Sequence, residues 1–453
     1  MGTVPAERVQ ALRDQCSGQV LGPGDAGYDE ARQVHNGLID KRPSLIVRCQ
    51  DTADVVDAVN LARDEGLEVS VRGGGHNVAG RAVTDGGLMI DLQAMKGVHV
   101  DPRAGTVRAQ AGVTWREFNR ATHVHGLATT GGVVSTTGIA GLTLGGGLGW
   151  LMGKYGMAID NVRSAEVVTA DGQVRTAGAD DDADLFWAVR GGGGNFGAAV
   201  SIEYDAHPLS MVVGGILAWP LADAPKVIDY YRDFTSTAAD EMTTFCGLVH
   251  APDGSGNKIV AMPLCYSGDI SAGEKTVAQI RSATSPLLDL TGPMPYPVVN
   301  TLLDDAFPRG ARNYWKSAFF KDLTSETVAV MIEAFERAPS TMSGLVIEHF
   351  HGLVTRIPAT ATAYPHREPG YNLVLISQWL DPREDDANVA WARSTFAALS
   401  PYMADAAYVN YLDHDDTDRV RMAYGPNWDR LVSLKQRYDP DNLFRLNANI
   451  RPN

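Results

Sequence analysis

Three consecutive glycines stand directly before a histidine in the stretch Arg72–Asn77, which reads Arg-Gly-Gly-Gly-His-Asn. The residues just before it, 67–71, alternate in the manner of a strand. Because glycine has no Cβ, a tight turn built from it leaves backbone N–H groups free to face an anion such as a pyrophosphate. We therefore expect His76 to lie beside the molecule that this turn binds. A surface turn with an ordinary histidine is the alternative that this stretch alone leaves open.

A second group of chemically active side chains lies in the strand-like stretch 345–352. With the two-residue period of a strand, His349 and His351 share one face, and Glu348 points to the other. Imidazole titrates near neutral pH, so the histidine face predicts a general base inside a substrate cavity. Tyr314 and Lys316 are further candidates for the cavity. The histidines could instead be hydrogen-bonded sheet residues, and Tyr314 and Lys316 could be a packed aromatic and part of a surface ion pair.

Two more glycine clusters follow along the chain. Residues 131–150 include eight glycines among Leu, Ile, Val and Trp, and Arg190–Gly197 contains five more just before the strand-like stretch 198–204. So many glycines would make a regular helix or sheet unfavourable in conformational entropy unless something compensates. The apolar residues between them argue against a flexible linker. We expect a flat, closely approaching cofactor to be the compensation.

The length and composition of the chain restrict its class. Its 453 residues fit two or three domains, and 44% hydrophobic residues supply a substantial core. A net charge of −15 argues against nucleic acid or an anionic membrane as the main partner. The four cysteines form no CxxC pair or zinc spacing, so we expect free thiols, no metal site and a reducing compartment. With no signal-like N-terminus and no 18-residue apolar segment, the prediction is a cytoplasmic protein.

The elements that must position these motifs predict an α+β fold. Strand, helix and strand follow one another within residues 44–71, an arrangement that usually places a phosphate loop at the carboxyl end of a strand. From 209 to 408 the glycine runs stop, and the pattern indicates a largely antiparallel sheet covered by helices on one face. The expected strands there are 212–219, 242–250, 258–266, 344–350 and 373–379, and the expected helices are 224–235, 272–283, 325–337 and 386–399.

Four motifs, in this order, resemble those of the berberine-bridge-enzyme-like oxidases of the vanillyl-alcohol-oxidase flavoprotein superfamily. They are Arg72–Asn77, Gly138–Trp150, Trp187–Gly197 and Tyr438–Ile450, and the resemblance covers nearly the whole chain. Secondary-metabolite tailoring oxidases are among the members that look most similar. The resemblance implies a two-lobed PCMH-type FAD-binding domain. It would be formed by residues 1–208 and completed by 409–453, with a substrate-binding domain at 209–408.

The same resemblance implies FAD covalently attached through His76 by an 8α-histidyl bond. Some members add a second bond through a cysteine four residues before the glycine that matches Gly138. That position is Val134 here, so we expect a single link. The residues that the motifs and the resemblance place at the cofactor are Arg72, Gly73, Gly74, Gly75, His76, Asn77, Gly80, Thr137, Gly138, Gly141, Gly145, Gly146, Gly147, Trp150, Gly194, Asn195, Gly197, Val200, Asn447 and Asn449.

The implied activity is that of an FAD-dependent oxidase. It would take hydride from a CH–OH or CH–NH group of a secondary metabolite, alkaloid or sugar and pass the electrons to dioxygen, giving hydrogen peroxide. The base is expected among His349, His351, Tyr314 and Lys316. Two alternatives stay open: a dehydrogenase or reductase that uses another electron acceptor, and a flavin-binding protein without turnover. The expected partners are a small-molecule substrate and dioxygen, and the sequence is silent on oligomeric state.

Overall fold

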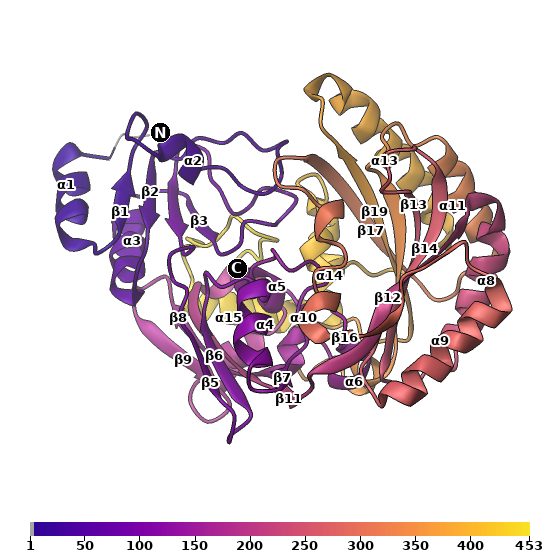
Figure 1. Cartoon of the computed structure of the whole chain (residues 1–453). Coiled ribbons are helices and arrows are strands. Elements are labelled where there is room, and N and C mark those ends of the chain that lie inside the picture. Colours follow the sequence, from indigo (N-terminus) through magenta and orange to yellow (C-terminus); the bar gives the residue numbers. More distant parts are fainter. Residues whose placement is uncertain (1–3) are drawn as a thin grey trace.

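The computed structural model describes residues 4–453 and confirms the α+β fold (Figure 1). The first lobe holds a four-stranded sheet in which three strands are parallel, because helix α3 (Thr52–Asp64) carries the chain back between two of them. Asp51 caps α3 by accepting a hydrogen bond from the backbone N–H of Asp54. In sheet order the strands are β1 (Gln19–Leu21), β2 (Leu45–Arg48), β4 (Leu88–Asp91) and β3 (Val69–Arg72), and the flanking helices are α1 (Ala6–Gln15) and α2 (Tyr28–Ala31).

The second lobe is a five-stranded antiparallel sheet with short helices. In sheet order its strands are β5 (Val98–Asp101), β6 (Thr106–Gln110), β10 (Ala198–Asp205), β8 (Val162–Val168) and β9 (Val174–Gly178). Its helices are α4 (Trp115–His123), α5 (Ile139–Leu144), α6 (Met152–Tyr155) and α7 (Ala183–Val189). A separate two-stranded pair joins β7 (Leu127–Ala128) to β11 (His207–Pro208) just before the chain enters the third sheet.

The third sheet has eight antiparallel strands. Seven follow one path, and β16 (Gly292–Pro295) pairs with β12 beside it. In order the seven are β15 (Leu288–Asp289), β12 (Met211–Pro220), β14 (Lys258–Tyr266), β13 (Met242–His250), β18 (Gly344–Phe350), β19 (Gly370–Trp379) and β17 (Arg312–Phe320).

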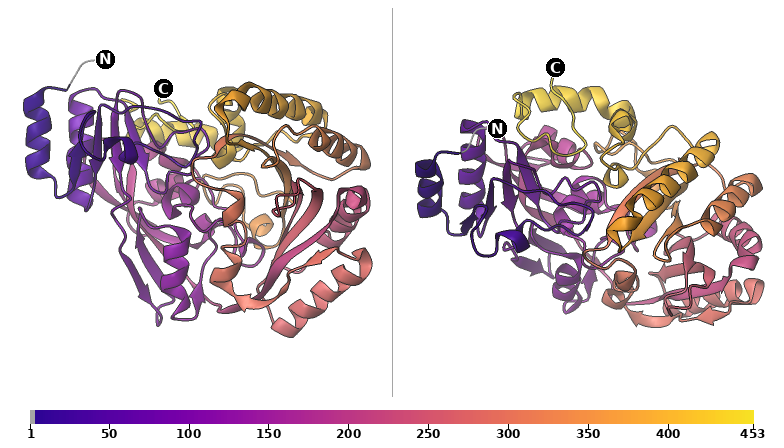
Figure 2. Two further views of the ribbon diagram at one scale, coloured as in Figure 1. Left: turned by 45° about the horizontal axis from the view of Figure 1, so that its top comes forward. Right: turned by 90° about the horizontal axis from the view of Figure 1, so that it is seen from above.

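Helices cover only one face of this sheet, so its other face is free to form a site. In Figures 1 and 2 the covering helices lie along the outer side, and the opposite face turns toward the first two lobes. Leu217, Leu248 and Ile347 alternate to the helical side and are buried in one hydrophobic cluster there. The covering helices are α8 (Ala224–Thr235), α9 (Ile270–Thr284), α11 (Ser325–Glu336) and α13 (Asp385–Leu399), and the short helices of this region are α10 (Tyr296–Val299) and α12 (Leu353–Arg356).

The C-terminal segment returns to the glycine-rich lobes through α14 (Val420–Tyr424) and α15 (Trp428–Tyr438). Asn195 in the third glycine cluster fixes this return. Its side-chain amide donates to the carbonyl of Ala448, at 3.0 Å, and its Oδ1 accepts from the N–H of Ile450, at 2.9 Å. The tail of the chain is thereby part of the same structure as residues 190–197.

Two of the differences from the sequence expectation bear on the predicted site residues. Strand β17 was not expected, although it carries Tyr314 and Lys316. Helix α5 forms inside the second glycine cluster, where no regular helix was expected. The helix is short, beginning after Gly138 and ending before Gly145, so only one glycine, Gly141, lies within it. Among residues 4–453, no helix combines the length and apolar character needed to cross a bilayer.

Candidate active site

A cavity of about 940 Å³ lies between the glycine-rich lobes and the inner face of the eight-stranded sheet. The loop after β3, the second and third glycine clusters and the C-terminal stretch 444–448 line one side of it. Strands β12, β13, β14, β17, β18 and β19 line the other. The cavity is therefore built from segments far apart in the sequence, and the four motifs found in the sequence meet at its glycine-rich wall.

The first two glycine clusters touch through their backbones. A Cβ on Gly138 would lie 2.7 Å from Gly74 Cα, and a Cβ on Gly74 would lie 2.6 Å from Gly138 Cα. Both positions must therefore be glycine for the two loops to meet. In the described part of the chain, the backbone N–H groups of Gly73, Gly74 and Gly75 donate to no backbone carbonyl. A row of unpaired N–H groups beside a cavity is suited to hold an anion.

Other glycines leave open space on the cavity side. A Cβ on Gly141 would meet no protein atom within 4 Å, and on Gly193 or Gly194 only one side-chain atom, at 3.9 Å. All three line the cavity. Glycine is not needed at Gly141 for packing within the protein, so the free space there fits a ligand that approaches the backbone closely.

His76 lines the same cavity and is half-buried. Its ring stacks on the ring of His35 with the centroids 4.0 Å apart, and its Nε2 lies 3.1 Å from Thr136 Oγ1. Burial, together with the neighbouring His35, lowers the pKa of His76 from 6.5 to about 3. The imidazole is therefore neutral at physiological pH and held in a fixed orientation.

Arg72 supports the first glycine turn from inside the protein. Its guanidinium donates to both carboxylate oxygens of Asp91, at 3.0 and 2.5 Å, and to the carbonyl of Gln33 at 2.8 Å. Both ionised side chains are almost fully buried, and two parallel hydrogen bonds fix their relative geometry. Arg72 thus positions the turn and is not among the residues that line the cavity.

The sheet side of the cavity carries a buried carboxylate, that of Glu348 on β18. Asn372 donates to its Oε2 at 2.6 Å, and Tyr411 donates to its Oε1 at 2.9 Å. Burial raises the pKa of Glu348 from 4.5 to about 7, and the two hydrogen bonds act in the opposite direction. A carboxyl that exchanges its proton near neutral pH is suited to general-base work.

The four residues expected to supply the base do not line this cavity. His349 lies on the opposite face of β18 and stacks on His351, which follows the strand, with ring centroids 4.6 Å apart. Tyr314 and Lys316 lie on the opposite face of β17, where both donate to Asp415 at 2.6 Å. The alternation along β18 was expected, but the side chains that face the cavity are Glu348 on β18 and Trp315 on β17.

The predicted cofactor residues fall into two groups. Those that line the cavity are Gly73, Gly74, Gly75, His76, Asn77, Thr137, Gly138, Gly141, Gly194, Asn195, Gly197 and Asn447. Those that do not line it are Arg72, Gly80, Gly145, Gly146, Gly147, Trp150, Val200 and Asn449. Trp150, for example, is fully buried and packs on Phe245, which does line the cavity, with ring centroids 5.0 Å apart.

Several lining residues were not found from the sequence, among them Tyr408, Tyr411 and Arg81. None belongs to a glycine motif or to an expected strand. Asn372 supports the site as well, through its bond to Glu348, although it does not line the cavity itself. The signal that could have found it is its place on the strand paired with β18, where it is the direct partner of Glu348.

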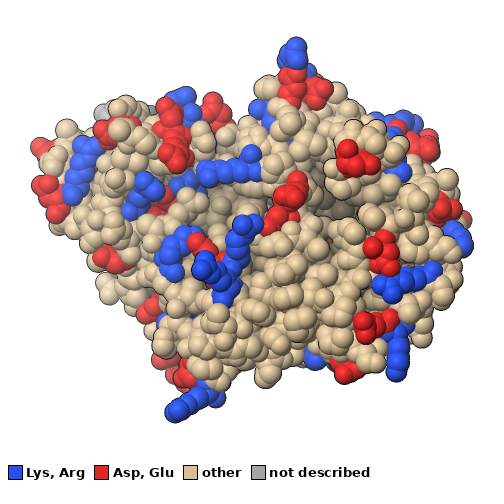
Figure 3. Space-filling view, in the orientation of Figure 1, with Lys and Arg blue, Asp and Glu red and all other residues tan. Residues whose placement is uncertain are grey.

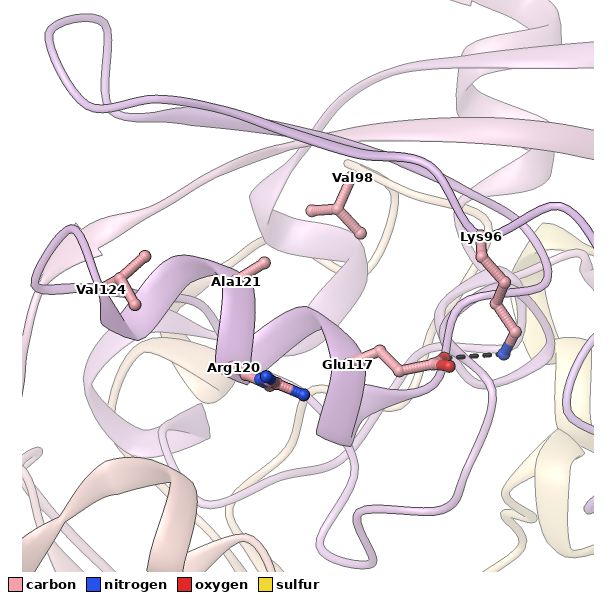
Figure 4. Close-up of a pocket in the computed structure, with 6 residues that line it drawn as sticks. All are labelled: Lys96, Val98, Glu117, Arg120, Ala121 and Val124. Atoms are coloured by element: carbon pink, nitrogen blue, oxygen red, sulfur yellow. Dashed lines mark hydrogen bonds and ion pairs between the residues drawn. The ribbon is translucent and has the colours of Figure 1, made fainter.

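A second hollow, of about 410 Å³, lies on the outer surface of α4 and β5 (Figure 4). It shares no lining residue with the main cavity. An ion pair between Lys96 Nζ and Glu117 Oε2, 2.7 Å apart, crosses one end of it. Val124, at the other end, is 77% exposed. We assign this hollow no chemical role.

The described residues contain one group of potential metal ligands, Asp413, His414 and Asp415. Its charges are already engaged within the protein. Asp413 Oδ1 lies 2.6 Å from His414 Nδ1, and Asp415 pairs with Lys316 and Arg393, at 2.6 and 2.9 Å. The group is therefore accounted for by ion pairs.

The three glycine clusters together form one wall of the cavity, which we call the glycine cradle, and within the described chain the N–H groups of Gly73, Gly74 and Gly75 in it have no backbone partner. The sheet opposite carries one buried carboxylate. This combination is that of an enzyme that binds an extended nucleotide cofactor. Comparison with known proteins identifies that cofactor. Residues 43–178 match the family model described as an FAD binding domain, and residues 407–451 match the one described as berberine and berberine-like. The chain belongs to the berberine-bridge-like family of FAD-linked oxidoreductases.

Relatives of this chain extend over its full length. It is 30% identical over 452 residues to (R)-6-hydroxynicotine oxidase of Paenarthrobacter nicotinovorans, covering 96% of this chain and 97% of that one. The crystal structure of 6-hydroxy-D-nicotine oxidase from Arthrobacter nicotinovorans superposes with a TM-score of 0.88 at 28% identity, over 97% and 98% of the two chains. The xylooligosaccharide oxidase of Myceliophthora thermophila, in complex with xylobiose, shares the fold, with a TM-score of 0.87 at 21% identity over the whole of both chains.

Proposed function

We propose that this chain is an oxidase that takes hydride from a CH–OH or CH–NH group of a small organic molecule and passes the electrons to dioxygen, giving hydrogen peroxide. The observation that carries the proposal is that His76 and Glu348 line one cavity, the first beside the glycine cradle and the second on the sheet. FAD supplies the hydride acceptor when it is bound. The chain itself has to hold the cofactor, orient the substrate and accept one proton.

The glycine-rich wall fits FAD. The unpaired N–H groups of Gly73, Gly74 and Gly75 would receive its pyrophosphate. The open space at Gly141, Gly193 and Gly194 would let the nucleotide lie against the backbone. Asn77 and Asn447 line the same wall and offer polar groups to it, whereas the side chain of Asn195 is engaged by Ala448 and Ile450.

His76 would hold the flavin ring by a covalent bond. Its support is chemical: an imidazole with a pKa of about 3 is neutral, so a ring nitrogen keeps the lone pair that a new bond requires. We propose one bond only. Val134 lines the cavity where a cysteine would be needed, and none of the four cysteines is among the lining residues.

Glu348 is the general base in this proposal. Its carboxylate would accept the proton of the substrate's O–H or N–H group as the neighbouring C–H loses hydride, so that a C=O or C=N bond forms. Asn372 and Tyr411 fix the carboxylate by one hydrogen bond to each oxygen. Tyr411 also lines the cavity, so the base and its donor meet the substrate together.

The covalent link is tested by precipitating the purified protein with acid. Yellow colour should stay in the wild-type pellet and move to the supernatant in His76→Ala. His35→Phe is the matched control, because it keeps an aromatic ring stacked on His76, and it should keep the colour in the pellet. A colourless wild-type pellet would refute the covalent bond while leaving FAD binding intact.

The electron acceptor is tested separately, by oxygen uptake and peroxide formation with a panel of alcohols and amines. An oxidase consumes dioxygen and forms peroxide in equal amounts. Turnover that requires an artificial dye and leaves dioxygen unconsumed would identify a dehydrogenase instead. A flavin that no alcohol, amine or sugar reduces under anaerobic conditions would refute the enzymatic proposal.

A further inference from the structure

A row of small residues crosses the cavity face of the eight-stranded sheet. Gly247 on β13 is the register partner of Ala261 on β14, which is in turn the partner of Ala218 on β12. The row continues to Val346 on β18 at one end and to Leu288 on β15 at the other. All five residues line the cavity. A Cβ on Gly247 would make ordinary van der Waals contacts, the nearest at 3.4 Å, so this position has room for a methyl group.

Larger side chains stand on both sides of the row. Two residues from the row in one direction along the strands, Phe245 and Pro263 line the cavity. Two residues from the row in the opposite direction, Val249 and Ile259 line it. The row is thus the floor of a trench that runs perpendicular to the strands. It spans four strand spacings from β18 to β15, or about 19 Å. Its inner end lies next to Glu348, two residues from Val346 on the same face of β18.

The trench is apolar along its whole length. Glu348 is the one carboxylate, and there is no lysine or arginine, among the sheet residues of the described lining. Two polar side chains farther along the sheet, Asn313 and Ser343, are paired within the protein, whereas Gln378 donates to the carbonyl of Ala306 and keeps an unpaired Oε1. Asn313 donates to the carbonyl of Ala311 and accepts from Trp315, and Ser343 exchanges hydrogen bonds with the backbone of Gln378.

The outer end of the trench opens at an exposed apolar rim. Leu288 is 42% exposed and Leu290 is 59% exposed, and both line the cavity. Figure 3 shows that this face of the molecule has a broad area without lysine, arginine, aspartate or glutamate over α10 and β16. The large exposed apolar side chains of the neighbouring segments are Met211, Leu287, Leu288, Leu290 and Val298.

We propose that the trench binds the elongated apolar body of the substrate, with the reacting CH–OH or CH–NH carbon at its inner end beside Glu348. This inference rests on the proposed function and specifies its substrate class: an uncharged or cationic, mainly hydrophobic molecule with few polar groups. Sugars are excluded, because hydroxyl groups lying along the trench would leave water without finding hydrogen-bond partners. Anionic substrates are excluded because the carboxylate of Glu348 would repel them.

The test uses three alcohols with the same reacting group and increasing length, benzyl alcohol, 4-biphenylmethanol and 4-terphenylmethanol, with cellobiose as the sugar. Binding to the FAD-loaded enzyme is followed by perturbation of the flavin absorption, and turnover is measured separately. Affinity should rise at least tenfold from benzyl alcohol to 4-biphenylmethanol, and cellobiose should not bind. Affinity that is independent of length, absence of binding by all three alcohols, or binding of cellobiose would overturn the proposal.

Filling the trench provides the second measurement. Ala261→Leu should lower the affinity for 4-biphenylmethanol at least tenfold and leave the affinity for benzyl alcohol unchanged. Ala278→Leu, the same change on the exposed side of α9, should leave the affinities for all three alcohols at the wild-type level. If the affinity of Ala261→Leu depended on alcohol length as it does in the wild type, the proposal that the trench binds the substrate would be overturned. Length-dependent binding without any turnover would leave the trench standing and refute the proposed oxidation of alcohols.

Discussion

Tyr411 donates its hydroxyl hydrogen to Oε1 of Glu348 across 2.9 Å, although the two residues lie on different segments 63 positions apart. The bond joins the base candidate on β18 to the segment that follows the substrate sheet. With Asn372 on the other oxygen, the carboxylate is held in place by two donors. A buried carboxylate fixed in this way can act on only one place in the cavity.

Replacing Glu348 by glutamine should abolish most of the activity while leaving the flavin bound. The change preserves the shape of the side chain, and Asn372 can turn its amide, because its Oδ1 has no partner in the structure. General-base catalysis contributes about 10²- to 10⁴-fold, so flavin reduction by substrate should slow by that factor. Anaerobic stopped-flow reduction measures it. His349→Gln, on the far face of β18, should stay within twofold of wild type.

Activity should depend on pH through Glu348. Its pKa is about 7, so the carboxylate form grows as pH rises, and kcat/KM should climb through about pH 7 to a plateau. Tyr411→Phe removes a hydrogen bond that stabilises the carboxylate, which should move this rise upward by about one pH unit. A profile that is identical in wild type and Tyr411→Phe would show that another group controls the rate.

The same group should contribute less to the stability of the protein as pH rises. Its pKa is 4.5 in the unfolded chain and about 7 in the folded one, so between these values the folded state holds the proton more tightly. The contribution of Glu348 to the free energy of unfolding should therefore fall by about 3 kcal/mol from about pH 4.5 to about pH 7 and be level above that. The buried histidines, whose pKa values are lowered, contribute in the opposite direction, so the effect of Glu348 is read from the difference between wild type and Glu348→Gln. Glu348→Gln should lack this loss and exceed wild type in stability at pH 8 but not at pH 4.5.

Urea denaturation at the two pH values measures this difference. Glu274→Gln, on the exposed surface of α9, makes the same chemical change without burial and should follow the wild-type pH dependence. Equal pH dependence in wild type and Glu348→Gln would mean that Glu348 titrates at the same pH in the folded and unfolded states.

The glycine motifs could be recognised in the sequence because so many glycines close together indicate that the backbone is approached closely by another group. Gly74 and Gly138 are required by a contact between backbones, and such a contact tolerates only glycine. The strand-like segments also predicted β12, β13, β14, β18 and β19 to within a few residues. Strand β17 was missed because aromatic residues occupy both of its faces, and the polar Tyr314 and Lys316 lie on the face behind the cavity, where they contact Asp415 and the buried Asp416.

The base candidate could not be assigned from the sequence, because both faces of β18 carry titratable groups. The residues on the partner strands show which of the two faces is turned to the cavity. On β13, Gly247 faces the cavity and Leu248 faces the helices, so the small residues mark the side that leaves room for a ligand. Glu348 shares that side. Register between strands, which a single sequence does not reveal, is the missing information.

A pair of glycine-to-alanine changes should separate the folding of the cradle from its binding of FAD. Gly138→Ala places a methyl group against the backbone of Gly74, where no side chain can move aside, so the protein should lose stability together with FAD. Gly141→Ala meets no protein atom within 4 Å and lies inside α5, where alanine favours a helix by about 1 kcal/mol. Its flavin-free form should melt at or above the wild-type temperature, while its affinity for FAD should fall at least tenfold, because the methyl group enters the space that the nucleotide would occupy.

Both changes are best made together with His76→Ala, so that FAD can be removed and titrated back by fluorescence. If Gly141→Ala binds FAD with undiminished affinity, the nucleotide does not lie against α5.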